Sequence, residues 1–82
     1  MSELQLTRQG RMKVIMQENA IGFEEFAFCL GKDPVAMEKL INSSHPKISD
    51  SLARLIEQTF SKASFWLDGD VQAQDNFDLF GS

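Results

Sequence analysis

The sequence has 82 residues, of which 43% are hydrophobic and 24% are charged; this length allows one compact domain, and this composition excludes a wholly disordered or collagen-like chain. A single cysteine, Cys29, and a single histidine, His45, exclude an internal disulfide and a metal site built from Cys and His ligands. The formal net charge of −4 counts against nucleic-acid binding, because affinity for phosphates depends on Lys and Arg.

Apolar residues recur at helical spacing along most of the chain, and no run alternates strictly as a strand does. The first helix is expected to start after Thr7 and to end within residues 19–22. The second is expected at Phe23–Leu30, where positions 23, 26, 27 and 30 have the spacing of a buried helix face. Gly31 should then end it in a left-handed turn, which glycine adopts at little cost.

Capping residues mark the next two helices. Asp33 is a favourable N-cap and Pro34 suits the first helical position, so a third helix is predicted from Pro34 to about Ile41. Residues 42–47 (NSSHPK) have the composition of a loop. Ser49 is predicted to cap a fourth helix that buries Leu52, Leu55, Ile56 and Phe60.

A short fifth helix is predicted at residues 61–67, where Phe65 and Trp66 should close the core. Cys29 is expected to be a small hydrophobic residue that is buried or half-buried. Together these elements predict an all-α fold of five helices in residues 1–70.

Residues 23–41 have the spacing of a helix-turn-helix, in which two short helices are joined by a tight glycine turn. Ala27 supplies a small residue where the helices cross, and Met37 and Leu40 supply apolar anchors on the second helix. Many ordinary helical hairpins carry Ala and Gly at such spacing, so this alternative stays open.

The segment 48–70 (ISDSLARLIEQTFSKASFWLDGD) resembles the fourth and fifth helices of the lambda-repressor-like helix-turn-helix family, found in phage and prophage regulators. The matching positions are Ile48, Ser49, Leu52, Ala53, Arg54, Ile56, Glu57, Lys62, Trp66, Leu67, Asp68 and Asp70. The resemblance covers roughly residues 7–70. It implies a five-helix domain that binds operator DNA as a dimer, with the second helix of the motif in the major groove.

The chain departs from this family where the family contacts DNA. Arg, Lys, Asn and Gln usually contact base edges, whereas Asp33 and Glu38 bring negative charge to this region. The candidate DNA-binding residues are Lys32, Val35, Ala36, Lys39, Asn42, Ser43, Ser44, His45 and Lys47. The alternative is that the three lysines are ordinary solvated side chains and that His45 is an exposed loop residue without a function.

Two other features suggest a protein partner. Phe28 and Val35 fall outside the expected buried faces, and surplus apolar residues on small helices can mark a binding surface, although a few exposed apolar side chains are normal. Residues 71–82 are predicted to be a flexible acidic tail with Phe77, Leu79 and Phe80 as candidate partner-binding residues alongside Phe28. The run NFDLF at 76–80 is similar to clamp-binding peptides of bacterial replication and repair proteins; the alternative is that these residues fold back or extend a dimer interface.

The expected function is a small DNA-binding regulator of phage or mobile-element type that blocks a promoter as a homodimer. The alternative is an interaction protein on the same fold that has lost most DNA contacts and binds a protein partner, as a co-repressor, an antirepressor or an inhibitor, through Phe28, Val35 or the NFDLF segment of the tail. One His and one Cys cannot form a nucleophile, base and orienting group, so no catalytic residue, cofactor or small-molecule substrate is expected. No stretch approaches the ~18 apolar residues of a membrane span, and a cytoplasmic protein is expected.

Overall fold

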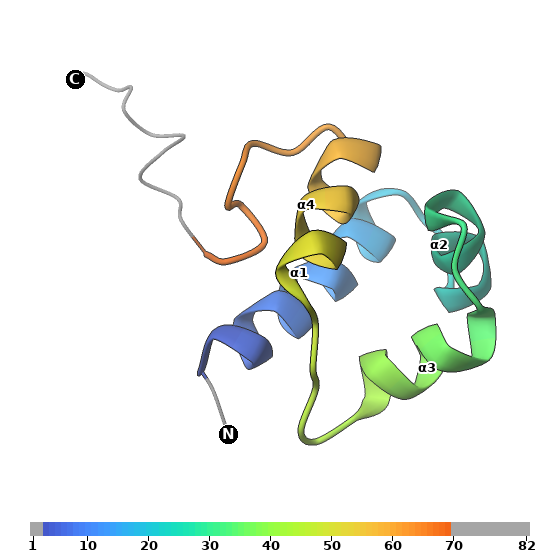
Figure 1. The fold of residues 1–82 in the computed structure, drawn as a ribbon. Coiled ribbons are helices and arrows are strands. Elements are labelled where there is room, and N and C mark those ends of the chain that lie inside the picture. The colour runs from blue at the N-terminus through green and yellow to red at the C-terminus, as the bar shows by residue number, and fades with distance from the viewer. Residues whose placement is uncertain (1–2, 70–82) are drawn as a thin grey trace.

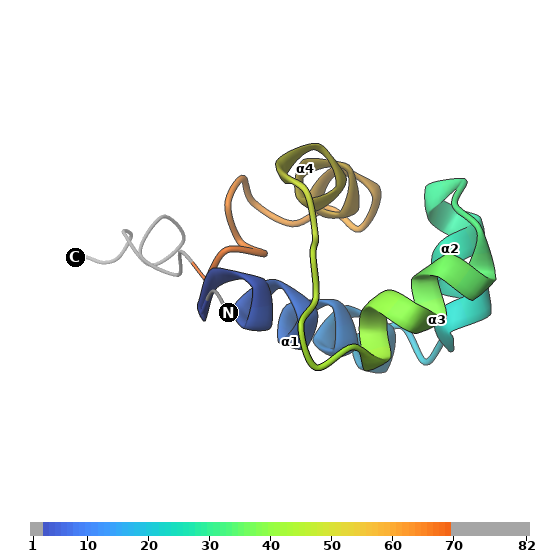
Figure 2. The same ribbon diagram turned by 60° about the horizontal axis from the view of Figure 1, so that its bottom comes forward.

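The computed structural model describes residues 3–69, which contain helices and turns and no strand. Four helices follow one another: α1 (Glu3–Glu18), α2 (Phe23–Leu30), α3 (Pro34–Asn42) and α4 (Asp50–Thr59) (Figure 1). α2 and α3 form a pair at one end of α1, and α4 lies above α1 in Figure 2. Within the described part, the prediction of an all-α fold is confirmed. No helix of residues 3–69 has the length and apolar character needed to cross a membrane.

The predicted fifth helix is wrong. Residues 61–69 form turns instead of a helix. Hydrogen bonds between residues three positions apart close these turns, such as Trp66 N–H to Ala63 O at 3.0 Å and Gly69 N–H to Trp66 O at 3.0 Å. Ser61 and Phe65 have positive φ values of 58° and 68°, which a right-handed helix does not accommodate. The described part of the chain therefore has four helices instead of five.

The start predicted for the first helix is also wrong, because α1 begins at Glu3 instead of after Thr7. The first half of α1 is polar and therefore lacks the regularly spaced apolar residues from which the sequence predicts a helix. Arg8 and Gln9 are nevertheless buried there, in line with the buried Met12 and Ile15. The buried face of α1 thus continues as polar side chains toward the N-terminal end.

The α2–turn–α3 unit matches its prediction closely. Gly31 has φ 68° and ψ 33°, its N–H donates to Phe28 O at 3.1 Å, and the N–H of Lys32 donates to Ala27 O at 2.9 Å. This pair of bonds is the Schellman arrangement that ends many helices. Nothing lies within 4 Å of a Cβ placed on Gly31, so the positive φ alone favours glycine there.

Both predicted N-caps are confirmed. Asp33 Oδ2 accepts a hydrogen bond from Ala36 N–H at 2.9 Å, directly before Pro34 at the start of α3. Ser49 Oγ accepts from Leu52 N–H at 3.1 Å at the start of α4. Each bond satisfies one of the backbone donors that a helix start leaves open.

The core lies where the four helices and the last turns meet. Phe26 is fully buried and stacks on Phe60, with ring centroids 5.3 Å apart. Trp66 is buried as predicted, but Phe65 is 51% exposed and its ring lies against the guanidinium of Arg54 at 4.4 Å. Other buried hydrophobic residues are Met12, Ile15, Ala27, Leu30, Met37, Ile41, Ile48, Ala53, Ile56 and Leu67.

Cys29, expected to be at least half-buried, is exposed. It follows Phe28 on α2, whereas the buried face of that helix is formed by Phe26, Ala27 and Leu30. The helical spacing therefore points Cys29 to solvent, and its small size does not bring it inside.

An ionic cluster around the buried Arg8 holds residues 61–69 against the helices. Arg8 Nε donates to Asp68 at 2.7 Å, Arg8 Nη2 donates to Asp50 at 2.7 Å, and Arg8 Nη1 donates to the backbone oxygen of Ile48 at 2.6 Å. Arg54 Nη2 also donates to Asp68 at 2.9 Å. The hydrogen bond from Arg8 is the main cause that lowers the pKa of Asp68 and, in return, raises the pKa of Arg8. The cluster joins the first helix to the last turns.

Candidate nucleic-acid interface

One side of α3 is open to solvent. Val35, Ala36 and Lys39 are exposed on this side, while Met37 and Ile41 are buried on the other. Positions 35, 36 and 39 are separated by three and four residues, which places their side chains along one helix face. This face continues into the loop that follows α3.

An open depression of about 460 Å³ lies between this face and the loop. It is lined by Ala36, Lys39, Leu40, Ser43, His45, Pro46 and Lys47, and we call it the α3–loop depression. Five of the nine candidate DNA-binding residues line it. The structure thus brings together residues from the helix and the loop that were proposed separately from the sequence.

Three polar residues of α1 fix this loop in place. Gln9 Nε2 donates to the backbone oxygens of Leu40 at 3.0 Å and Ser43 at 2.7 Å, where the helix passes into the loop. At the other end, Gln5 Oε1 accepts from Ile48 N–H at 2.6 Å, and Arg8 donates to Ile48 O. Both ends of the loop are therefore anchored to α1. Sequence analysis did not identify these positioning residues, although positions 5, 8 and 9 continue the spacing of Met12 and Ile15.

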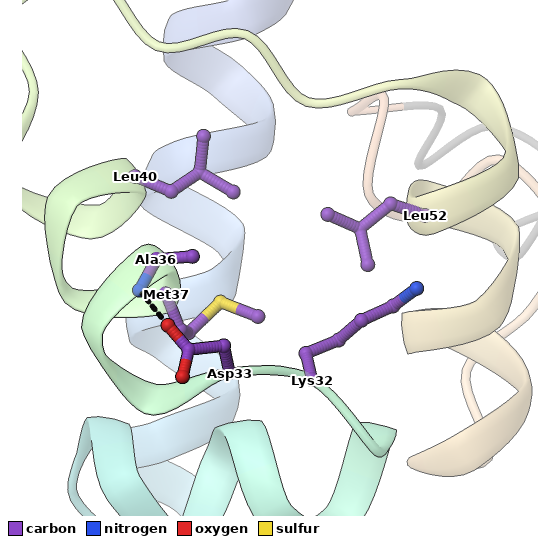
Figure 3. Close-up of a pocket in the computed structure, with 6 residues that line it drawn as sticks. All are labelled: Lys32, Asp33, Ala36, Met37, Leu40 and Leu52. Carbon is purple, nitrogen blue, oxygen red and sulfur yellow. Dashed lines mark hydrogen bonds between the residues drawn. The ribbon is translucent and has the colours of Figure 1, made fainter.

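A second, narrower depression lies between α3 and α4 (Figure 3). It has a volume of about 140 Å³ and is lined by Lys32, Asp33, Ala36, Met37, Leu40 and Leu52; we call it the α3–α4 groove. Ala36 and Leu40 line both depressions. Lys32 therefore belongs to the same side of the molecule as Lys39 and Lys47.

Lys32, Lys39 and Lys47, which we call the lysine face, are exposed, and none forms a salt bridge with a carboxylate among residues 3–69. Asp33 lies beside Lys32 in the groove and keeps its negative charge while its Oδ2 accepts the N–H of Ala36, so one carboxylate stands among the three lysines. Glu38 is exposed and lines neither depression. The lysine face can therefore offer positive charge to an anionic partner.

The remaining candidate residues are more scattered. Val35 is 57% exposed, and Asn42 and Ser44 are exposed, but these three line neither depression. Phe28 on α2 is 85% exposed, as expected from its place outside the buried face. Phe77, Leu79 and Phe80 lie outside the described residues, as do all the positions assigned to the tail at 71–82.

This side of the molecule can bind a partner through ammonium groups, hydroxyls, an imidazole and small apolar groups. Residues 3–69 contain no group of three or more His, Cys, Asp or Glu side chains placed to hold a metal ion. Comparisons of the chain with protein-family models, with curated proteins and with solved structures gave no match. A functional assignment therefore depends on the geometry of the lysine face and of the two depressions beside it.

Proposed function

We propose that this protein is a small DNA-binding regulator with a lambda-repressor-like helix-turn-helix, formed by α2 and α3, that blocks a promoter as a homodimer. The observation that carries the proposal is the lysine face, whose three ammonium groups lie free of salt bridges beside the exposed side of α3. In helix-turn-helix proteins the second helix enters the major groove. α3 occupies that position in the motif.

Each class of side chain has a role in this proposal. Lys32, Lys39 and Lys47 bind phosphates and set the position of the protein on the duplex. Val35 and Ala36 lie near the start of α3, where small apolar groups can contact the thymine methyl group in the major groove. Further polar contacts to phosphates or base edges come from Asn42, Ser43, Ser44 and His45.

Affinity should be weak and strongly dependent on salt. Only three lysines are available, and each neutralised phosphate contributes a slope of about −0.9 to the plot of log affinity against log salt. We expect Lys39→Ala to weaken binding to all sequences and to reduce this slope by about one. The measurement is fluorescence anisotropy with duplexes from the DNA flanking the protein's own gene, at several salt concentrations.

Lys13→Ala is the matched control, because Lys13 is exposed on α1 and lines neither depression. It removes the same charge and should change affinity and slope much less than Lys39→Ala. Equal effects of the two substitutions would contradict the assignment of the lysine face. A folded protein that binds no duplex even at low salt would contradict DNA binding itself.

The exposure of Phe28 supports a second candidate function, an interaction protein on the same fold. The ring of Phe28 is 85% exposed on α2, and contact with another protein would remove this apolar surface from water. This candidate predicts that Phe28→Ser abolishes self-association or partner binding, measured by sedimentation velocity, while Lys39→Ala has no effect on it. A sedimentation profile that Phe28→Ser leaves unchanged would count against it.

A further inference from the structure

The α3–α4 groove has the size and lining of a site for one aromatic ring. Its volume of about 140 Å³ is close to that of an engineered apolar cavity of about 150 Å³ that binds benzene. Figure 3 shows Met37 and Leu40 on one side facing Leu52 on the other, with the ammonium of Lys32 at the edge. Apolar walls open to water are stabilised when an apolar group covers them.

Residues 70–82 of the same chain have the complementary chemistry. They contain Asp70, Asp75 and Asp78, no Lys or Arg, and the aromatic residues Phe77 and Phe80. Their negative charge is complementary to the positive charge of the lysine face, and a phenylalanine ring matches the groove in size and in apolar character. Phe77 has an aspartate two residues before it and another directly after it, whereas Phe80 has an aspartate only on its N-terminal side.

The segment is also long enough for Phe77 to reach the groove. The eight residues that lead from Gly69 to Phe77 span about 27 Å when extended, slightly more than the length of about 24 Å of the 16-residue helix α1. α1 extends along most of the described body in Figure 2. A chain that leaves the body at Gly69 can therefore reach the groove on the same molecule.

We propose that Phe77 docks in the α3–α4 groove of its own chain, with Asp75 and Asp78 against the lysine face. Because Lys32 and Ala36 line this groove and are candidate DNA contacts, the docked segment and a DNA duplex cannot occupy this side together. The segment therefore acts as an internal competitor of DNA. The docking does not depend on the proposed function; the competition rests on it.

The docking is tested on the full chain by NMR with 13C-labelled methionine methyl groups. The sequence has four methionines, and the signal of Met37 is assigned by its loss in Met37→Leu. Phe77→Ala should shift the Met37 signal, because a ring in the groove changes the local magnetic field, and should leave that of the buried Met12 unchanged. Phe80→Ala is the matched control and should have a smaller effect. No shift of Met37 in Phe77→Ala, or a larger shift in Phe80→Ala, would overturn the proposal.

Dilution distinguishes docking within one chain from docking between two copies. The Met37 signal should stay constant on dilution, because the segment is tethered to its own groove. A signal that moves toward the Phe77→Ala position on dilution would show that a second copy supplies the ring, and would overturn docking within the chain.

DNA affinity tests the competition separately. Phe77→Ala leaves the net charge unchanged, so tighter DNA binding by this variant can only follow from release of the segment. If nine of ten molecules are docked, binding should tighten about tenfold. A Met37 shift without DNA binding by either protein would support docking and overturn the proposed function. DNA binding of equal strength without a Met37 shift would overturn docking and leave the proposed function standing.

Discussion

Glu57 is almost completely shielded from water, with 2% of its surface exposed. Its two carboxylate oxygens accept hydrogen bonds from Arg54 Nε and Nη2 at 2.9 and 3.0 Å and from the backbone N–H groups of Phe65 and Leu67 at 3.1 and 2.8 Å. A buried charge is tolerated when such partners surround it. Arg54, Glu57 and Asp68, which contribute to the family resemblance, thus have a structural role in holding the last turns.

We expect Glu57→Ala to lower the free energy of unfolding by at least about 2 kcal/mol, because it leaves the backbone N–H groups of Phe65 and Leu67 without their acceptor and removes one partner of the half-buried Arg54. Gln58→Ala on the same helix is the control; Gln58 is exposed, and its loss should change stability by about 0.5 kcal/mol or less. Urea unfolding measures both. Equal stability of the two variants would show that Glu57 does not hold the turns.

The ionic cluster also predicts how stability changes with pH. Hydrogen bonds from Arg8, and then from Arg54, lower the pKa of Asp68 in the folded state. A carboxyl group with a lowered folded pKa stabilises the fold above its unfolded pKa of about 3.9, and this contribution is lost as the pH falls through the folded pKa. The free energy of unfolding should therefore decrease below about pH 5, and this decrease should be shallower in Asp68→Asn. Parallel pH curves from urea unfolding of the two proteins would contradict this role.

At the scale of elements, the turn between α2 and α3 depends on local backbone chemistry. Gly31 has a positive φ with free space around it, so a side chain there is strained by the backbone and not by a neighbour. Gly31→Val should lower the free energy of unfolding by more than about 1 kcal/mol. Gly10→Ala, on an exposed position inside α1, should raise it by about 0.5–1 kcal/mol. A melting temperature unchanged by Gly31→Val would show that the turn tolerates side chains.

Helix ends that are set by nearby residues, such as the end of α2 at Gly31, could be predicted from the sequence. Gly31, Asp33 and Ser49 act on the backbone within a few residues, and the helix ends that they set were predicted. The turns at 61–69 depend on Arg8, whose partner Asp68 lies sixty residues away in the chain, and a local pattern carries no signal for such a contact. The sequence therefore favoured a helix there, and placed Phe65 in the core.

The candidate site was predictable to a similar extent. The candidates Ala36, Lys39, Ser43, His45 and Lys47 were named from the sequence and line one depression. The residues that position them, Gln5 and Gln9 among them, were missed because polar side chains were not expected on a buried helix face. Whether a polar residue is buried depends on which distant backbone groups need its hydrogen bonds.

At the scale of the whole molecule, an overall acidic chain can still present a local basic surface. Arg8, Arg54 and Lys62 form ion pairs with carboxylates, so these charges cancel locally. The lysine face keeps its charge, and the sequence places three further aspartates at 70–82. The net charge of −4 is therefore a poor guide to the field beside α3, since an exposed charge acts over about a Debye length of 10 Å at 0.1 M salt.

In the proposed function, DNA binds on the side formed by α3 and the loop after it. This binding side is tested by titrating the 15N-labelled full chain with a duplex from the DNA that flanks its gene, followed by two-dimensional NMR at low salt. We expect the largest changes in amide signals within residues 32–47 and little change at residues 61–67. Changes that centre on residues 61–67, or that are spread evenly over all four helices, would contradict it.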